Sequence, residues 1–208
     1  MPRRFPVIGQ LAHPRGVLAP ATAFMLNIVN RPINRWATGS LELTGSEDVL
    51  DVGFGGGIGL ELVSRRLTSG RLFGVDISEE MADRAARRFA DDPRGGSALV
   101  LVGDVSKLPF ADASFDRAYS VNAVFFWPDP VAGIAEIHRV MRPGGLAVIA
   151  GPTSAFLLAR VAGIGPAAPS GPGSVRRIAQ EAGFNDVRIR RAPGAALIPR
   201  QLSYGRFR

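Results

Sequence analysis

The sequence predicts an α/β protein with one doubly wound, mostly parallel sheet of seven strands and a helical cover at its N-terminus. Short apolar segments that do not alternate with polar residues, such as 98–103 (ALVLVG), are typical of parallel strands covered on both faces. Segments with helical spacing of apolar residues separate these strands, and this alternation predicts βαβ units. A length of 208 residues suits a single domain.

Residues 1–44 and 45–208 differ in their apolar pattern, which predicts an N-terminal helical arm or lid followed by the α/β domain. The arm is expected to contain an irregular stretch over 1–14 and helices over 15–29 and 32–43. Pro32 can open the second helix, because proline fits a first helical turn.

Within 45–208, seven segments have the apolar composition of strands and the segments between them have helical spacing. The strands are expected at 48–53, 71–76, 98–103, 115–120, 146–150, 187–191 and 195–198. The helices are expected at 59–67, between Ser78 and Phe89, at 130–141 and at 174–182.

Composition and charge narrow the classes of function. The chain has no cysteine, which excludes disulfides, thiolate metal sites and cysteine nucleophiles. Its net charge of +7 is uneven, because residues 1–40 and 176–208 are basic and the section between them is acidic. Basic ends are compatible with peripheral membrane contact, but the simpler interpretation is a solvated arginine surface. Nucleic acid is not an expected partner, because there is no added RNA-binding module.

No segment has the pattern of a signal peptide or a membrane span. Pro6, Gln10 and His13 interrupt the apolar residues of the N-terminal segment. The longest apolar stretch, 144–169, contains Pro152 and Arg160 and falls short of a span. We therefore expect a cytoplasmic protein, and the sequence predicts no particular oligomeric state.

The strongest functional motif is a glycine-rich loop between an expected strand and an expected helix. It reads Asp51-Val-Gly53-Phe-Gly55-Gly-Gly57. Glycines let a backbone turn sharply and approach a ligand closely. The acid can meet a cationic ligand group, and free amides at a helix start favour an anionic one. A zwitterionic amino-acid moiety satisfies both requirements.

A dinucleotide-binding loop is the main alternative, and the spacing argues against it. A G-x-G-x-x-G motif read from Gly53 or Gly55 would place Ile58 or Leu60 at its third glycine. An NAD(P)-dependent oxidoreductase is further disfavoured because Lys107 is the only lysine and no Tyr-x-x-x-Lys pair exists. A non-catalytic cofactor-binding scaffold is a second alternative, and the intact loop argues against it.

Two more acidic residues follow expected strands. Asp76, next to Ile77, ends the strand at 71–76, where a carboxylate can reach ribose hydroxyls. Asp104, before Val105, follows the strand at 98–103, where it can reach an adenine edge. The alternatives are structural: Asp76 can cap the next helix and Asp104 can satisfy local turn amides.

Four motifs occur in order: VLDVGFGGGIGLE, GVDIS, GDVSKLPFADASFDRAYSVNAV and EIHRVMRPGG. Together they resemble the class I S-adenosylmethionine-dependent methyltransferases, and in particular the small-molecule branch with the ubiquinone/menaquinone-type enzymes. The resemblance covers about 45–150 and implies a Rossmann-like fold with S-adenosylmethionine as cofactor. Two departures from the family pattern are Phe54, where a small polar residue is common, and the short apolar segment after Gly151.

The resemblance also implies roles for matching residues. Asp51 and the glycines of the loop would surround the methionine part of the cofactor, and Asp76 would hold the ribose. Asp104 and the backbone of Val105 would read the adenine. Asn122, at the end of the strand at 115–120, would line the methionine and methyl side.

Aromatic residues suggest the kind of acceptor. Phe125, Phe126 and Trp127 follow the fourth expected strand, at the edge where ligands bind such sheets. With Phe24 they are candidates for the wall of a pocket for a small lipophilic or aromatic molecule. The alternative for the two Phe residues is core packing, whereas Trp127, which precedes a proline, is expected near the surface.

Methyl transfer by direct in-line displacement needs alignment and water exclusion, and a base only for some acceptors. His13, in the N-terminal arm, and Asp129 are the candidate catalytic residues. Asp129 can equally cap the following helix. His138 is expected to be a packing residue, and no cluster with metal-ligand spacing occurs.

Overall fold

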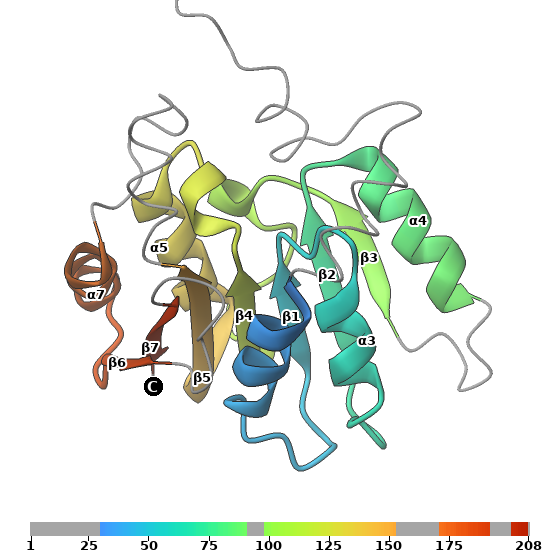
Figure 1. Ribbon diagram of the computed structural model, residues 1–208, viewed down its shortest axis with the longest axis horizontal. Coiled ribbons are helices and arrows are strands. Elements are labelled where there is room, and N and C mark those ends of the chain that lie inside the picture. Colours follow the sequence, from blue (N-terminus) through green and yellow to red (C-terminus); the bar gives the residue numbers. More distant parts are fainter. Residues whose placement is uncertain (1–29, 91–97, 153–170, 192–200, 208) are drawn as a thin grey trace, which may run out of the picture.

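The computed structural model describes residues 30–90, 98–152, 171–191 and 201–207 of the chain (Figure 1). The expected helix at 15–29, the arm at 1–14 and the expected strand at 195–198 lie outside these residues. His13 and Phe24 lie outside them as well.

A parallel sheet of five strands forms the centre of the domain. Its strands are β1 (Val49–Val52), β2 (Leu72–Asp76), β3 (Leu99–Val102), β4 (Phe115–Val121) and β5 (Met141–Pro152). They lie side by side in the order β3-β2-β1-β4-β5, and all four neighbouring pairs are parallel. The strand order reverses at β1, so that β1 and β4 enclose the switch point at which open α/β sheets bind ligands.

Two antiparallel strands continue the sheet beyond β5. β7 (Gln201–Phe207) pairs with β5, and β6 (Arg188–Arg191) pairs with β7. The segment expected as a strand at 187–191 is thus found, whereas the last described strand lies further along the chain than 195–198.

Helices cover both faces of the sheet (Figure 1). One face carries α5 (Pro130–Val140) and α7 (Pro172–Glu181), whose apolar side chains join Leu50 and Ile149 in one core cluster. The other face carries a helix over 30–39, α3 (Ile58–Ser64) and α4 (Glu79–Ala90), which pack on Val49 and Val148. Neighbouring strand residues thus face opposite clusters, which confirms the α/β, Rossmann-like class.

Besides the last strand, four elements differ from their expected ranges. The helix expected at 32–43 lies over 30–39, and β5 is longer than the strand expected at 146–150. α3 ends at Ser64 before the expected end at 67, and α7 begins at Pro172 before 174. Single helical turns, η2 (Val105–Lys107) and η3 (Val124–Phe126), follow β3 and β4. No helix in the described part of the chain is both long and apolar enough to cross a membrane.

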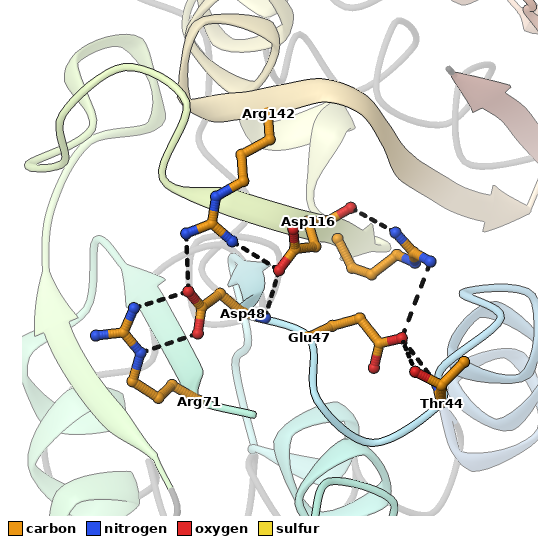
Figure 2. Close-up of polar contacts among 7 residues, drawn as sticks. Thr44, Glu47, Asp48, Arg71, Asp116 and Arg142 are labelled. Atoms are coloured by element: carbon orange, nitrogen blue, oxygen red, sulfur yellow. Dashed lines mark hydrogen bonds and ion pairs between the residues drawn. The ribbon is translucent and has the colours of Figure 1, made fainter. Parts of the chain in front are cut away.

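An ion-pair network joins the amino ends of four neighbouring strands (Figure 2). Asp48, just before β1, accepts hydrogen bonds from Nε and Nη2 of Arg71, at the start of β2, and from Nη2 of Arg142 in β5. Arg142 also donates to Asp116 in β4, at 2.7 Å, and the Asp116 carboxylate accepts from the Asp48 backbone amide. The network therefore fixes the starting positions of β1, β2, β4 and β5 relative to one another.

Charge pairing in this network stabilises the ionised form of Asp48. Hydrogen bonds from Arg71 outweigh the effect of burial and, with those from Arg142, lower the pKa of Asp48 to about 2. Burial opposes ionisation of the neighbouring Glu47, but hydrogen bonds from Thr44 and Gly45 outweigh it and lower its pKa to about 2. Both carboxyl groups therefore stabilise the folded state where they are charged.

We expect Asp48→Asn to lower the free energy of unfolding by about 2 kcal/mol at pH 7, because two arginines lose their shared carboxylate. The folded pKa lies below the unfolded value, so the contribution is complete above about pH 5 and disappears as the pH falls toward 2. Urea unfolding of the wild type and the variant at several pH values measures it.

Asp112→Asn is the matched control, because Asp112 also pairs with an arginine but its side chain is 78% exposed. Its loss should change the stability by less than about 1 kcal/mol. Equal effects of the two substitutions, or an Asp48 effect that does not decline in acid, would contradict this account of the network.

Candidate functional site

The candidate site lies at the carboxyl ends of the three neighbouring strands β2, β1 and β4. Asp51 is the third residue of β1, Asp76 is the last of β2, and Asn122 follows the last residue of β4. The parallel order of these strands brings residues from three distant parts of the sequence to one edge. The structure thus places the residues expected to bind the methionine and ribose parts of a cofactor at the same edge.

The Asp76 carboxylate ties the glycine loop to the neighbouring strand end. Its Oδ2 accepts from the Gly55 amide at 2.8 Å, and its Oδ1 accepts from the Ser78 amide at 2.9 Å. The second bond is a turn contact just before α4, whose first turn is capped by Ser78: its hydroxyl oxygen accepts from the Met81 amide at 3.4 Å. Asp76 therefore does not cap this helix, which was its structural alternative. The first bond spans 21 residues and orders the loop after β1. A carboxylate has about four acceptor positions, so these bonds orient Asp76 and are compatible with a ligand hydroxyl.

The glycine loop requires glycine for two different physical reasons. Gly53, Gly55 and Gly57 have φ values of 74°, 52° and 78°, in the left-handed region that other residues rarely adopt. A Cβ at Gly53 would also lie 2.6 Å from that of Ala123, so the loops after β1 and β4 are in close contact. A Cβ at Gly55 or Gly57 would meet no atom of the described segments within 4 Å, so these segments leave open space beside the loop there.

Phe54, the unusual residue of the loop, packs into the core and does not line that space. It is buried, and a Cβ at Gly74 in β2 would lie 2.8 Å from its ring. The departure from the family pattern at this position is therefore accommodated by a glycine on the neighbouring strand.

Asp51 is a buried carboxyl group whose charge has no pairing partner among the described residues. Its exposed fraction is 3%, and no lysine or arginine side chain of the described segments forms an ion pair with it. Burial raises the pKa of Asp51 to about 8, with Tyr119 opposing the rise and the nearby Asp76 charge adding to it. Asp51 is therefore protonated at neutral pH, and a cation bound beside it would displace that proton.

Three residues beside Asp51 were not identified from the sequence. A Cβ at Gly59 in α3 would lie 2.9 Å from each of Asn34 Oδ1, Asp51 Oδ2 and Tyr119 Cε2. The Tyr119 hydroxyl is buried and influences Asp51, but its geometry falls short of a hydrogen bond to any described residue. Tyr119 lies on the same strand face as Val121, so strand periodicity could have identified it. Nothing in the sequence places Asn34 beside β1.

The residues expected near an adenine have local structural roles in the described fold. Asp104 Oδ1 accepts from the amide and the hydroxyl of Ser106 and caps η2, as the turn interpretation predicts. Val105 is buried in the core, whereas the neighbouring strand end exposes Ile77. The backbone of Val105 and the carboxylate of Asp104 stay at the end of β3, beside the end of β2.

The aromatic residues after β4 are mostly core residues. Trp127 is 6% exposed, and a Cβ at Gly133 in α5 would lie 2.8 Å from its ring. The expectation that Trp127 lies near the surface is therefore wrong, because a glycine one turn into α5 makes room for the indole. Phe125 is also buried, against Gly151, whereas Phe126 is partly exposed and packs edge-on with Phe125.

Asp129 and His138 occupy the two ends of α5. Asp129 Oδ1 accepts from the amides of Val131 and Ala132, so this exposed residue caps the helix, as one of its two interpretations predicts. His138 packs edge-on against Phe184 with ring centroids 4.8 Å apart, consistent with the packing role expected for it.

Comparisons with known proteins identify the same part of the chain. Residues 50–149 match the model of the methyltransferase domain family. The chain is 32% identical over 126 residues to the uncharacterized methyltransferase YdaC of Bacillus subtilis, an alignment that covers 61% of this chain and 67% of YdaC. It is also 32% identical over 122 residues to the ubiquinone/menaquinone biosynthesis C-methyltransferase UbiE of Geobacter sp. strain M21, covering 58% of this chain and 52% of UbiE.

Among solved structures, the fold is similar to that of a SAM dependent methyltransferase from Aquifex aeolicus. The TM-score is 0.71 at 20% sequence identity, with 90% of this chain and 97% of the other covered. The chain spans two thirds of YdaC but only about half the length of the UbiE relative.

We expect Gly59→Ala to lower the free energy of unfolding by about 1–3 kcal/mol, because the new methyl group would push apart Asn34, Asp51 and Tyr119. Gly173→Ala is the matched control, since Gly173 is also helical but exposed, with nothing within 4 Å of a Cβ. The control should gain about 0.5–1 kcal/mol from helix propensity. Thermal and urea unfolding of both variants measure the difference, and a stabilising effect at both positions would contradict this packing.

Proposed function

The chain belongs to the class I S-adenosylmethionine-dependent methyltransferases, and we propose that it transfers the methyl group to a small lipophilic or aromatic acceptor by direct in-line displacement. The observation that carries the proposal is the arrangement of Asp51, the glycine loop and Asp76 at the switch point of the sheet. Family membership also argues against the NAD(P)-dependent oxidoreductase considered above.

The residues present fit S-adenosylmethionine in charge and shape. The open space beside Gly55 and Gly57 gives an extended ligand access to the loop backbone. Asp51, whose burial without a partner raises its pKa, is suited to a ligand that brings its own cation, such as an α-ammonium group. Asn122 adds a buried amide oxygen that has no hydrogen-bond partner among the described residues.

When bound, S-adenosylmethionine supplies a methyl group already activated on a sulfonium. The residues of the chain then bind the cofactor and orient it. In our proposal Asp51 and the glycine loop hold the methionine part, Asp76 holds the ribose, and Asp104, Val105 and Ile77 border the adenine. With the cofactor so fixed, an acceptor needs to be aligned with the methyl group and water excluded.

The acceptor class rests on similarity and on one described aromatic side chain. A relative named as a ubiquinone/menaquinone biosynthesis C-methyltransferase supports a lipophilic or aromatic acceptor. Phe126 is the partly exposed member of the aromatic run and, together with Phe24, remains a proposed wall residue. Burial of Phe125 and Trp127 gives them a supporting role beneath that wall. If the acceptor is a hydroxyl, His13 and Asp129 are the proposed bases.

We include two architectural features in this proposal. Residues 1–44 would act as a lid over the acceptor, with 45–208 as the methyltransferase domain. The sheet would have seven strands, with β6 near the segment expected at 187–191 and β7 further along the chain than the strand expected at 195–198.

We expect the purified protein to bind S-adenosylmethionine and S-adenosylhomocysteine, but not NADP⁺, in isothermal titration calorimetry. Asp76→Asn should weaken both interactions about 10- to 150-fold, because it removes a charge-assisted hydrogen bond to the ribose. The asparagine keeps one oxygen, which can accept from the Gly55 amide but not also from the Ser78 amide, and circular dichroism tests whether the fold stays intact. Binding of NADP⁺ in place of the two adenosyl ligands would overturn the proposed function.

We also expect cofactor binding at pH 7 to release about one proton, because ionised Asp51 binds the cation and its pKa is raised to about 8. Because the free protein holds this proton below about pH 8, the affinity for the cofactor falls up to about tenfold per pH unit as the pH decreases. Calorimetry in two buffers with different ionisation enthalpies measures the release.

Asp51→Asn is the control for this proton, since the amide has none to release in this range. It should bind more weakly and show affinity independent of pH between 6 and 8. Wild-type binding without proton release would contradict the assignment of the cation to Asp51.

A further inference from the structure

Two asparagines on one face of the helix over 30–39 connect this helix to the site. Asn30 and Asn34 are one helical turn apart, and Asn34 Nδ2 donates to the Asn30 carbonyl at 2.9 Å. The side chain of Asn34 is buried and its Oδ1 lies beside Gly59, Asp51 and Tyr119. Asn30 reaches in the other direction, to the loop after β4. The helix over 30–39 therefore lies beside Asp51 at one end and contacts the loop after β4 at the other.

Asn122 is held in an unusual conformation at this contact. Its φ of 59° is in the left-handed region, which asparagine tolerates better than most residues. Its amide donates to the Ala150 carbonyl at 2.8 Å, and its Nδ2 donates to Asn30 Oδ1 at 2.7 Å. The backbone and one end of the side chain are thus fixed, each by a different segment of the chain.

The other end of the Asn122 side chain is an acceptor without a donor. Asn122 Oδ1 is buried and has no hydrogen-bond partner among the described residues. An unsatisfied buried amide oxygen costs about 1–3 kcal/mol unless a ligand or water supplies the donor. Because Asn122 follows β4 at the edge that also carries Asp51 and Asp76, the bound cofactor is the natural source of that donor.

We propose that Asn30 is a positioning residue, which orients the Asn122 amide so that its oxygen accepts a hydrogen bond from the amino-acid part of the cofactor. This inference rests on the proposed function. An amide side chain can present either its oxygen or its nitrogen, and in the structure Asn30 presents Oδ1, so that Asn122 turns Nδ2 toward the helix. Loss of that acceptor frees the amide to rotate.

The proposal links cofactor binding to the N-terminal part of the chain. Asn30 is the first described residue of the helix over 30–39, and residues 1–29 precede it. A displacement of this helix would release the Asn122 amide and weaken the cofactor's amino-acid end. The family match at 50–149 does not include Asn30 or Asn34, so this contact comes from a part of the chain outside the shared domain.

The test compares two ligands that differ only at the amino-acid end. S-Adenosylhomocysteine carries that end, and 5′-methylthioadenosine lacks it. Asn30→Ala should weaken binding of the first about tenfold, as expected for a lost hydrogen bond to a charged group, and leave the second unchanged. Asn30→Asp should keep wild-type affinity within about threefold, because aspartate can only accept and holds Nδ2 in place. Calorimetry measures all affinities without requiring an acceptor.

Arg35→Ala is the matched control, because Arg35 is exposed on the same helix. It should bind both ligands as the wild type does, and thermal unfolding without ligand should show that all variants fold. Equal binding of S-adenosylhomocysteine by the wild type and Asn30→Ala would overturn this inference alone, as would equal weakening of both ligands. Failure of the wild type to bind S-adenosylhomocysteine would overturn the proposed function and the inference with it.

Discussion

Two buried carboxyl groups, one at each end of β1, have opposite electrostatic environments, and the arrangement of the domain follows from that difference. Asp48 and Asp51 are three residues apart. Two arginines satisfy the first, and its pKa falls to about 2, whereas burial without a cation raises the pKa of the second to about 8. A parallel sheet has distinct amino and carboxyl edges, so one strand can carry a structural charge at one edge and a binding charge at the other.

The ion pairs at the amino edge of the sheet provide stability that offsets the cost of the unpaired carboxyl group at the carboxyl edge. An uncompensated carboxyl group destabilises the folded state, because it must hold a proton or remain charged in an apolar environment. Asp48, Arg71, Asp116 and Arg142 fix the starting positions of four strands, and those strands then place Asp51 at the same edge as Asp76 and Asn122. The ion-pair network and the candidate site thus lie at opposite edges of the sheet.

The backbone of the candidate cofactor site could be predicted from the sequence, because local patterns determine the conformation of its glycine loop. The left-handed φ values at Gly53, Gly55 and Gly57 need glycine whatever surrounds them. Trp127 could not be placed correctly, because its burial depends on Gly133, which makes room for the ring only once α5 has packed. Asn34 could not be found at all, since no local pattern fixes how the helix over 30–39 lies against the sheet.

The features set by local sequence patterns are also the ones that the relatives share, whereas features set by packing are particular to this chain. The family match spans 50–149, which contains Asp51, the glycine loop, Asp76 and Asn122, the residues proposed to bind the cofactor. The aromatic run after β4 lies inside that region, and the buried positions of Phe125 and Trp127 show that much of it maintains the core. Selectivity for an acceptor therefore has to depend on residues that the core leaves free, and the helix over 30–39 contacts the site from outside the shared region.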